Sequence, residues 1–236
     1  MTVGASAHRR PPVVPPGAAP PLAILGVTAS GKSALALELA RSRGDVELVS
    51  VDSMQVYRGM DIGTAKPSAA EQTEVRHHVI DLVDPWEPFD VHAFQDAVRV
   101  ALADIAVRGK RGVGVGGRCL CARVVVDNLD LPGRYPEVLA ELEAEPDTVA
   151  LHARLAALDP LAAARMEPTN RRRVLRALEV TVGSGRPFSS FGPGFETHPP
   201  TSVHLVGLWL PRPVVVERIE ARYRRQMADG FLAEVA

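Results

Sequence analysis

The chain has 236 residues, of which 46% are hydrophobic and 23% are charged, a composition typical of a globular protein. Its net charge of −1 excludes nucleic-acid binding through overall positive charge, so any such surface has to be local. Apolar runs fall short of transmembrane length, and the two cysteines, Cys119 and Cys121, are too close for an ordinary disulfide, so we expect a protein of the reducing cytoplasm.

Strands and helices alternate over the first half of the chain. Residues 1–21, rich in proline and alanine, are predicted to form a disordered leader. The pattern then predicts a strand at 22–26, a helix at 32–43, a strand at 46–51, a loop at 53–66, a strand at 77–82, a helix at 89–108, a strand at 113–115 and a helix at 120–126. Strands joined by helical crossovers predict a parallel, doubly wound α/β sheet that binds its ligand at the carboxyl ends of the strands.

The first predicted strand leads into the turn Gly26-Val27-Thr28-Ala29-Ser30-Gly31-Lys32-Ser33, which fits the pattern G-x-x-x-x-G-K-[ST]. Its glycines permit backbone angles at which successive N–H groups point toward phosphate oxygens, and the following helix adds its positive dipole end. Lys32 supplies a charge for the outer phosphate, and the Ser33 hydroxyl can hold Mg²⁺. The turn is therefore predicted to bind a diphosphate or triphosphate. The alternative is an ordinary glycine-rich turn between a strand and a helix.

The composition changes after residue 132, where strand signals become rare. Residues 137–158 and 161–182 are helix-periodic, and we expect residues 133–200 to form a helical insertion. A strand at 203–210 and a basic helix at 214–228 return to the core, which therefore comprises 22–132 and 201–236. The chain stops at Ala236 while residues 231–235 still predict a helix, so we expect a further C-terminal segment to be missing.

Asp52 directly follows the second predicted strand, at the edge of the sheet where the phosphate-binding turn opens. A carboxylate in this position can take a proton from an incoming nucleophile or orient it. It can instead bind Mg²⁺, as in P-loop kinases, or cap a turn. The pattern alone leaves these three roles open.

Residues 52–66 have the sequence DSMQVYRGMDIGTAK. Together with the phosphate-binding turn and TNRRRVLRALEV at 169–180, this segment resembles the bacterial tRNA dimethylallyltransferases, also called tRNA isopentenyltransferases. The resemblance runs from about Leu22 to the end of the chain and includes HHVID at 77–81 and GRPF at 185–188. It implies a P-loop core with a helical tRNA-binding insertion. The implied reaction moves a dimethylallyl group from dimethylallyl diphosphate to the exocyclic amine of the adenosine 3′-adjacent to the tRNA anticodon, releasing diphosphate.

The resemblance also implies roles for individual residues. Asp52 is the general base on the adenosine amine, Lys32 stabilises the leaving diphosphate, and Ser33 is a ligand of Mg²⁺. The donor diphosphate is held by Gly26, Val27, Thr28, Ala29, Ser30, Gly31, Lys32 and Ser33, with help from Arg218 and Arg222. The anticodon stem-loop, with its target base extruded, is contacted by Asp52, Ser53, Met54, Gln55, Arg172, Arg173, Val174, Leu175 and Arg176.

Two basic segments fit this expectation. Residues 165–186 carry a net charge of +4 and residues 212–225 a net charge of +3. Arginine suits phosphate through its planar, two-pronged geometry. Without the resemblance, two solvated helix faces would explain both segments equally well.

One stretch departs from the family's pattern. Gly116 and Gly117 are usually followed by Thr or Ser and then Gly-Leu-Tyr, whereas this chain has Arg118-Cys119-Leu120-Cys121. Arg118 can pair with Asp52 and weaken it as a base, or reach a diphosphate or RNA phosphate, and is counted here with the catalytic residues. Beside an active, monomeric prenyltransferase, two alternatives are open: a catalytically impaired tRNA-binding remnant of the family, and a small-molecule P-loop kinase that uses ATP.

Overall fold

The computed structural model describes residues 20–117, 120–129, 131–191 and 201–236. These residues form two compact units, one made of the described residues up to 129 and from 201 onward, the other of residues 131–191. The predicted disordered leader lies outside the described residues, apart from its last two. Within the described ranges, no helix is long and apolar enough to cross a membrane.

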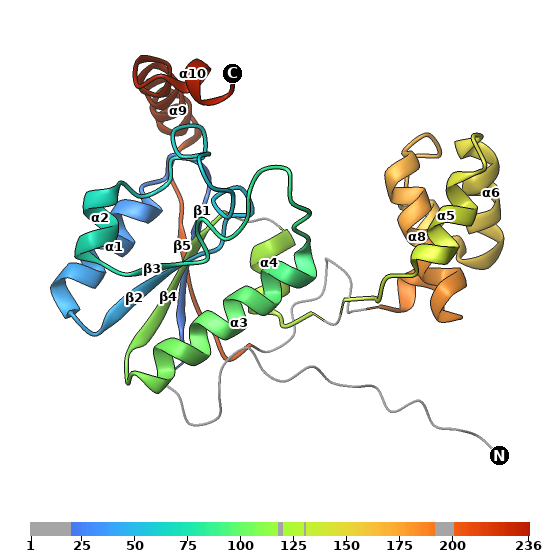
Figure 1. Ribbon diagram of the computed structural model, residues 1–236, viewed down its shortest axis with the longest axis horizontal. Coiled ribbons are helices and arrows are strands. Elements are labelled where there is room, and N and C mark those ends of the chain that lie inside the picture. The colour runs from blue at the N-terminus through green and yellow to red at the C-terminus, as the bar shows by residue number, and fades with distance from the viewer. Residues whose placement is uncertain (1–19, 118–119, 130, 192–200) are drawn as a thin grey trace. The chain divides into compact units, whose positions relative to one another are not determined.

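The first unit is built on a parallel five-stranded sheet with the strand order β3-β2-β4-β1-β5 (Figure 1). Strand β1 lies between β4 and β5, with Leu22 opposite Val113 on one side and opposite His204 on the other. The strands are β1 Leu22–Gly26, β2 Val46–Ser50, β3 His77–His78, β4 Arg111–Gly116 and β5 His204–Leu208. The predicted parallel α/β sheet is confirmed.

Helices cover both faces of this sheet. Val46 and Leu48 of β2 pack on the side of α1 (Lys32–Arg43). Their neighbour Val49 points to the opposite face, where it packs against α3 (Val91–Val107) and α4 (Leu120–Val126). Since successive side chains of a strand alternate between faces, a strand between two helical layers has its side chains buried on both sides, and in β2 this includes Glu47 and Ser50.

Three further helices belong to the described part of the first unit: α2 (Ala69–Glu74), α9 (Arg212–Ala228) and α10 (Phe231–Glu234). Helix α2 begins with a capping box, in which the Ser68 side chain accepts from the Glu71 N–H and the Glu71 carboxylate accepts from the Ser68 N–H. After β5, the chain forms α9 and α10. The predicted strand at 77–82 is wrong beyond His78, because Val79 and Asp81 adopt φ angles of 62° and 52°, which a strand cannot contain.

The second unit is helical. Its core contains Leu142, Leu155, Val174 and Leu178. Its elements are α5 (Pro136–Glu143), α6 (Thr148–Leu158), α7 (Pro160–Ala164), α8 (Arg171–Ser184) and the short helix η1 (Phe188–Ser190).

Both long helices predicted for the second unit are interrupted. The first breaks where the Asp147 side chain accepts from the N–H groups of Val149 and Ala150 and starts α6. The second breaks where the Asn170 side chain accepts from the N–H of Arg173 and starts α8. A polar side chain that caps the N-terminus of one helix also ends the helix before it. This capping therefore divides each predicted helix, although the apolar periodicity continues through it.

Candidate active site

The turn between β1 and α1 folds as a tight loop whose two glycines are both required. A Cβ atom on Gly26 would lie 2.6 Å from Ser30 Oγ and 3.0 Å from the Leu208 carbonyl oxygen, so no side chain fits there. Gly31 has a φ of 91° and is the N-cap of α1. The side chain of Ser33 is exposed in the first turn of that helix. The amino end of α1 is therefore open to an anion.

A pocket of about 220 Å³ adjoins this turn and lies entirely within the first unit. Helix α1 contributes Lys32 and Ser33 to it, and the segment after β2 contributes Asp52. Its remaining lining residues are Ala34, Leu37, Leu48, Val49, Ser50, Gln55, Thr64, Ala65, Lys66, Pro67, Glu71, His77, Val115, Gly116 and Arg222. The pocket thus combines three cations, two carboxylates and three hydroxyl groups with several apolar side chains.

The charges in this pocket act on one another. Burial lowers the pKa of the Lys32 ammonium group, the nearby Asp52 carboxylate opposes that effect, and the Arg222 guanidinium adds to it. Lys32 Nζ donates a hydrogen bond to the Val27 carbonyl oxygen at 3.3 Å and so remains close to the turn. The two cations repel each other, which favours an anion between them.

The carboxylate of Asp52 is held by a backbone N–H group two residues further along the chain. One carboxylate oxygen, Oδ1, accepts a hydrogen bond from the Met54 N–H at 2.9 Å. None of the described residues donates a hydrogen bond to the other oxygen, Oδ2. A carboxylate fixed on one side and open on the other is suited to accept a proton from a bound molecule.

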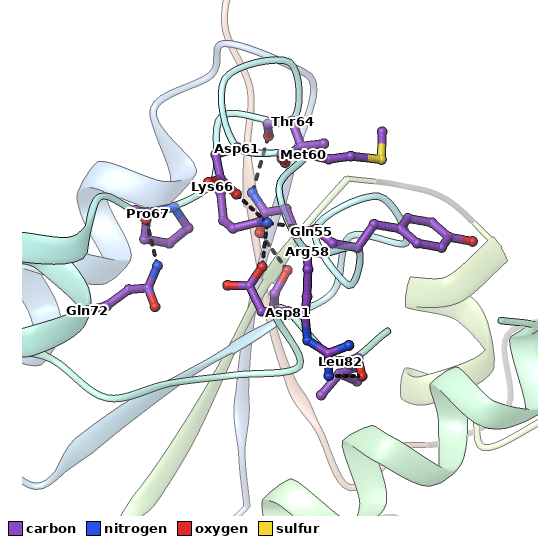
Figure 2. Close-up of polar contacts among 12 residues, drawn as sticks. Gln55, Arg58, Met60, Asp61, Thr64, Lys66, Pro67, Gln72, Asp81 and Leu82 are labelled. Atoms are coloured by element: carbon purple, nitrogen blue, oxygen red, sulfur yellow. Dashed lines mark hydrogen bonds and ion pairs between the residues drawn. The ribbon is translucent and has the colours of Figure 1, made fainter. Parts of the chain in front are cut away.

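The loop after Asp52 is anchored by a buried lysine, as Figure 2 shows. The side chain of Lys66 is only 2% exposed, and Nζ donates to Asp61 Oδ1 at 2.5 Å, to Asp81 Oδ1 at 2.6 Å and to the Tyr57 carbonyl oxygen at 2.8 Å. Burial by itself lowers the pKa of Lys66, but the Asp61 and Asp81 carboxylates hold it above its usual value. The ammonium group therefore stays charged and ties together three separate points of the loop.

Gln55 has an internal role in the same loop. Its Oε1 accepts from Ser50 Oγ at 2.7 Å. Its Nε2 donates to the carbonyl oxygen of Thr64 (Figure 2) and to that of Ala65, each at 3.2 Å. The amide is thereby occupied by the protein itself. Ser53 and Met54, by contrast, are exposed directly after Asp52.

Helix α9 contributes two arginines to this region. Arg222 lines the pocket, and its Nη2 donates to the Gly63 carbonyl oxygen at 3.5 Å. Arg218, one turn earlier, lies beside the phosphate-binding turn, since a Cβ atom on Gly31 would be 3.8 Å from Arg218 Nη1. The structure thus places both arginines near Lys32. Arg118, which the sequence also places among the catalytic residues, lies outside the described residues.

The predicted tRNA-contacting residues of α8 differ in whether their side chains are exposed or are engaged within the second unit. Arg172 and Arg173 are exposed at the start of α8. Arg176 instead donates to Glu179 Oε2 and to the Pro132 carbonyl oxygen, each at 2.8 Å. The side chains of Val174 and Leu175 are buried in the core of the unit, at 0% and 8% exposure.

Several contributors to the site were not singled out from the sequence as site residues. Among them are Lys66, Glu71 and His77, which line the pocket. The run Asp61-Ile62-Gly63-Thr64-Ala65-Lys66 did carry a signal through its resemblance to the family. His77 carried the same signal through HHVID at 77–81, whereas Glu71 carried none, because its place in the pocket depends on how α2 returns to the sheet.

Two family models match the chain. One described as IPP transferase matches residues 55–236, and one described as isopentenyl transferase matches residues 22–82. A tRNA dimethylallyltransferase of Roseiflexus sp. strain RS-1 is 46% identical over 223 residues, which cover 92% of this chain and 72% of the relative. One from Geobacter metallireducens is 46% identical over 218 residues, which cover 90% and 70%.

Solved structures give the same result. The tRNA isopentenylpyrophosphate transferase of Bacillus halodurans superposes with a TM-score of 0.61 at 37% identity, covering 92% of this chain and 68% of that one. A eukaryotic dimethylallyltransferase acting on tRNA superposes with a TM-score of 0.76 at 29% identity, covering 91% and 54%. Both similarities extend over nearly the whole of this chain.

Proposed function

The chain belongs to the tRNA dimethylallyltransferase family, and we propose that the pocket shared by Lys32 and Asp52 is its active site. The reaction moves a dimethylallyl group from dimethylallyl diphosphate to the exocyclic amine of the adenosine 3′-adjacent to the tRNA anticodon. One observation supports this assignment most strongly: the phosphate-binding turn and a carboxylate with an open oxygen face the same pocket.

The donor diphosphate is bound by the turn and by three cations. Backbone N–H groups from Gly26 to Ser33 and the amino end of α1 receive the phosphate oxygens. Lys32, Arg218 and Arg222 surround the same position and stabilise the charge that grows on the leaving diphosphate. The exposed Ser33 hydroxyl fits Mg²⁺, a hard cation that prefers oxygen ligands and is often shared between one protein oxygen and a diphosphate; Mg²⁺ would supply further positive charge there.

Asp52 acts as the general base on the acceptor, the adenosine of the tRNA. As the exocyclic nitrogen of adenosine forms its bond to the first carbon of the dimethylallyl group, the carbon–oxygen bond to diphosphate breaks, and its electron pair leaves with the diphosphate. The nitrogen must then lose a proton, which the open oxygen of Asp52 accepts. An amine conjugated to a purine is a weak nucleophile, so a base at this proton accelerates the transfer.

The tRNA is bound through exposed groups of both units. Ser53 and Met54 contact the extruded base beside Asp52. Arg172 and Arg173 contact RNA phosphates, since their guanidinium groups are exposed at the start of α8. Gln55 and Arg176 position the loop and the helix that carry these groups.

Two parallel reactions test this function. Purified protein is incubated with Mg²⁺, unmodified tRNA and labelled dimethylallyl diphosphate, and separately with labelled ATP. We expect label in the tRNA and no ATP turnover. ATP turnover without transfer would support a small-molecule kinase, and tRNA binding without transfer would support a non-catalytic RNA-binding protein.

A further inference from the structure

The last helix of the chain is bonded to the loop that follows Asp52. Glu234 Oε2 accepts hydrogen bonds from the N–H groups of Asp61 at 2.7 Å and Ile62 at 2.6 Å, and Oε1 accepts from the Gly63 N–H at 2.8 Å. Three consecutive backbone N–H groups thus converge on one carboxylate from a residue more than 170 positions away. Such a nest of N–H groups favours a negative charge.

A second residue of the same helix pair holds the carbonyl side of the loop. Gln226 is buried at 8% exposure, and its Nε2 donates to the Ile62 carbonyl oxygen at 2.6 Å and to that of Gly63 at 3.1 Å. The ring of Phe231 lies against Gly63, where a Cβ atom would come within 2.6 Å of it. Both polar groups of Ile62 and Gly63 are therefore fixed by α9 and α10.

The loop held in this way leads directly into residues 64–67, which line the pocket. Asp61 is an ion-pair partner of Lys66, and the Thr64 and Ala65 carbonyl oxygens hold the amide of Gln55. Lys66, Thr64, Ala65 and Gln55 all line the pocket. Helix α9, on the other side of the same bonds, carries Arg222 into that pocket and within 3.5 Å of the Gly63 carbonyl oxygen.

On the basis of the function proposed above, we infer that Glu234 is a positioning residue for the diphosphate site: its carboxylate fixes the loop 61–63 to α10, which follows α9, and so holds Arg222 of α9 in place for the donor. Burial by itself raises the pKa of Glu234, but the N–H groups of Gly63, Ile62 and Asp61 hold it below its usual range. The carboxylate is therefore charged at neutral pH, and its hydrogen bonds are the stronger, charge-assisted kind.

The decisive variant is Glu234→Gln, which keeps the size of the side chain but turns an N–H donor toward the nest. Its matched control is Glu220→Gln, which removes an exposed α9 carboxylate whose ion pair among the described residues is with Arg224 on the surface. We expect Glu234→Gln to raise the KM for dimethylallyl diphosphate roughly tenfold, as the loss of about one charge-assisted hydrogen bond would, with the Kd for tRNA within about twofold. Glu220→Gln should leave both values unchanged.

A double-mutant cycle separates positioning from a general loss of structure. If Glu234 acts through Arg222, the variant Glu234→Gln with Arg222→Ala should have nearly the same KM as Arg222→Ala alone. Additive effects, or a KM for Glu234→Gln equal to that of the Glu220→Gln control, would overturn the inference. If Glu234→Gln does not fold, Gln226→Met, which releases the same two residues of the loop, replaces it in the cycle.

Binding of inorganic diphosphate with Mg²⁺, followed by calorimetry, makes the outcome independent of prenyl transfer. A wild-type chain that binds diphosphate but transfers no prenyl group would contradict the proposed function alone. In that case weaker diphosphate binding by Glu234→Gln, with faster amide hydrogen exchange confined to residues 61–63, would still support the positioning role. Unchanged binding and exchange would reject it.

Discussion

The ammonium group of Lys32 and the carboxylate of Asp52 face one pocket from different elements, the first turn of α1 and the segment after β2, and their charges attract each other. In the proposed function, this relationship brings together the group that binds the donor's diphosphate and the group that takes the acceptor's proton. The two steps of a transfer reaction can thus occur within one small volume.

The pH dependence of Lys32 gives a first prediction. Because burial lowers its pKa in the native state, the unfolded chain binds more protons than the native chain between that lowered value and the ordinary lysine value of about 10.4. Stability relative to the Lys32→Met variant should therefore rise with pH across this window. Urea unfolding of both proteins between about pH 7 and pH 10 measures this difference, and a difference that falls or stays flat would contradict the burial of the charged group.

Diphosphate binding should change in the opposite direction over the same pH window. The protonated Lys32 is the form that attracts phosphate, so affinity for inorganic diphosphate should fall as the group loses its proton. Lys32→Met should bind diphosphate weakly at every pH and show less of this decline. Calorimetric titration of both proteins would reveal it, and parallel pH profiles would exclude Lys32 from the site.

Removal of the exposed arginines of α8 should affect tRNA binding, whereas removal of Arg176 should affect stability. Replacing Arg172 and Arg173 together by alanine should weaken tRNA binding, and the slope of log affinity against log salt should become shallower by roughly 1 for each arginine that binds a phosphate. Filter binding at several salt concentrations provides this slope. Arg154→Ala, on the exposed side of α6, is the control and should leave it unchanged.

Arg176→Ala should act on stability instead, because this side chain bonds to Glu179 and to the Pro132 carbonyl oxygen. The loss of these bonds should lower the melting temperature of the full chain while the salt slope of tRNA binding stays the same. A reduced slope with unchanged stability would mean that Arg176 contacts RNA directly.

Two aspartates of the second unit allow a matched stability test. Asp159 is 2% exposed, caps α7 through the Ala162 N–H and also accepts from the N–H and hydroxyl of Ser189. Asp147 caps α6 but is exposed. Asp159→Ala should cost about 2–4 kcal/mol of unfolding free energy and Asp147→Ala about 1 kcal/mol, measured by denaturant unfolding of the full chain. Equal costs would show that burial and the Ser189 bonds contribute little.

Much of the fold of the first unit follows from local sequence patterns. The strand at 22–26 and the helices at 32–43 and 120–126 have the predicted limits, because turn residues and apolar periodicity coincide there. The strand at 77–82 was overestimated, since nothing in its β-branched and apolar run reveals the left-handed backbone of Val79 and Asp81. In the second unit, Asp147 and Asn170 are residue types that commonly cap helices. The prediction of two long helices followed the apolar periodicity instead and missed these two N-caps.

The family itself was predictable from residues 52–66 and is confirmed by the matching family models. The contacts that hold the pocket's loop to the last two helices were not predictable from the sequence. Glu234 meets Gly63, 171 positions earlier in the chain, and Arg222 meets the same residue from α9. Contacts of this kind depend on how α9 returns to the sheet, which local patterns do not encode.

The acceptor side of the site is best probed by Asp52→Asn, which keeps an oxygen for the Met54 N–H and removes the base. Loss of a general base typically costs a factor of 10² to 10⁴ in rate. Binding of tRNA should change by less than about twofold. Glu38→Gln, which alters an exposed carboxylate of α1 outside the pocket, is the control and should react like the wild type.

Single-turnover transfer of labelled dimethylallyl from its diphosphate to unmodified tRNA, with Mg²⁺ present, compares these proteins most directly. The pocket shared by Lys32 and Asp52 predicts labelled tRNA from the wild type and from Glu38→Gln, and a rate at least about a hundredfold lower from Asp52→Asn. Transfer by Asp52→Asn at the wild-type rate would contradict this assignment of the active site.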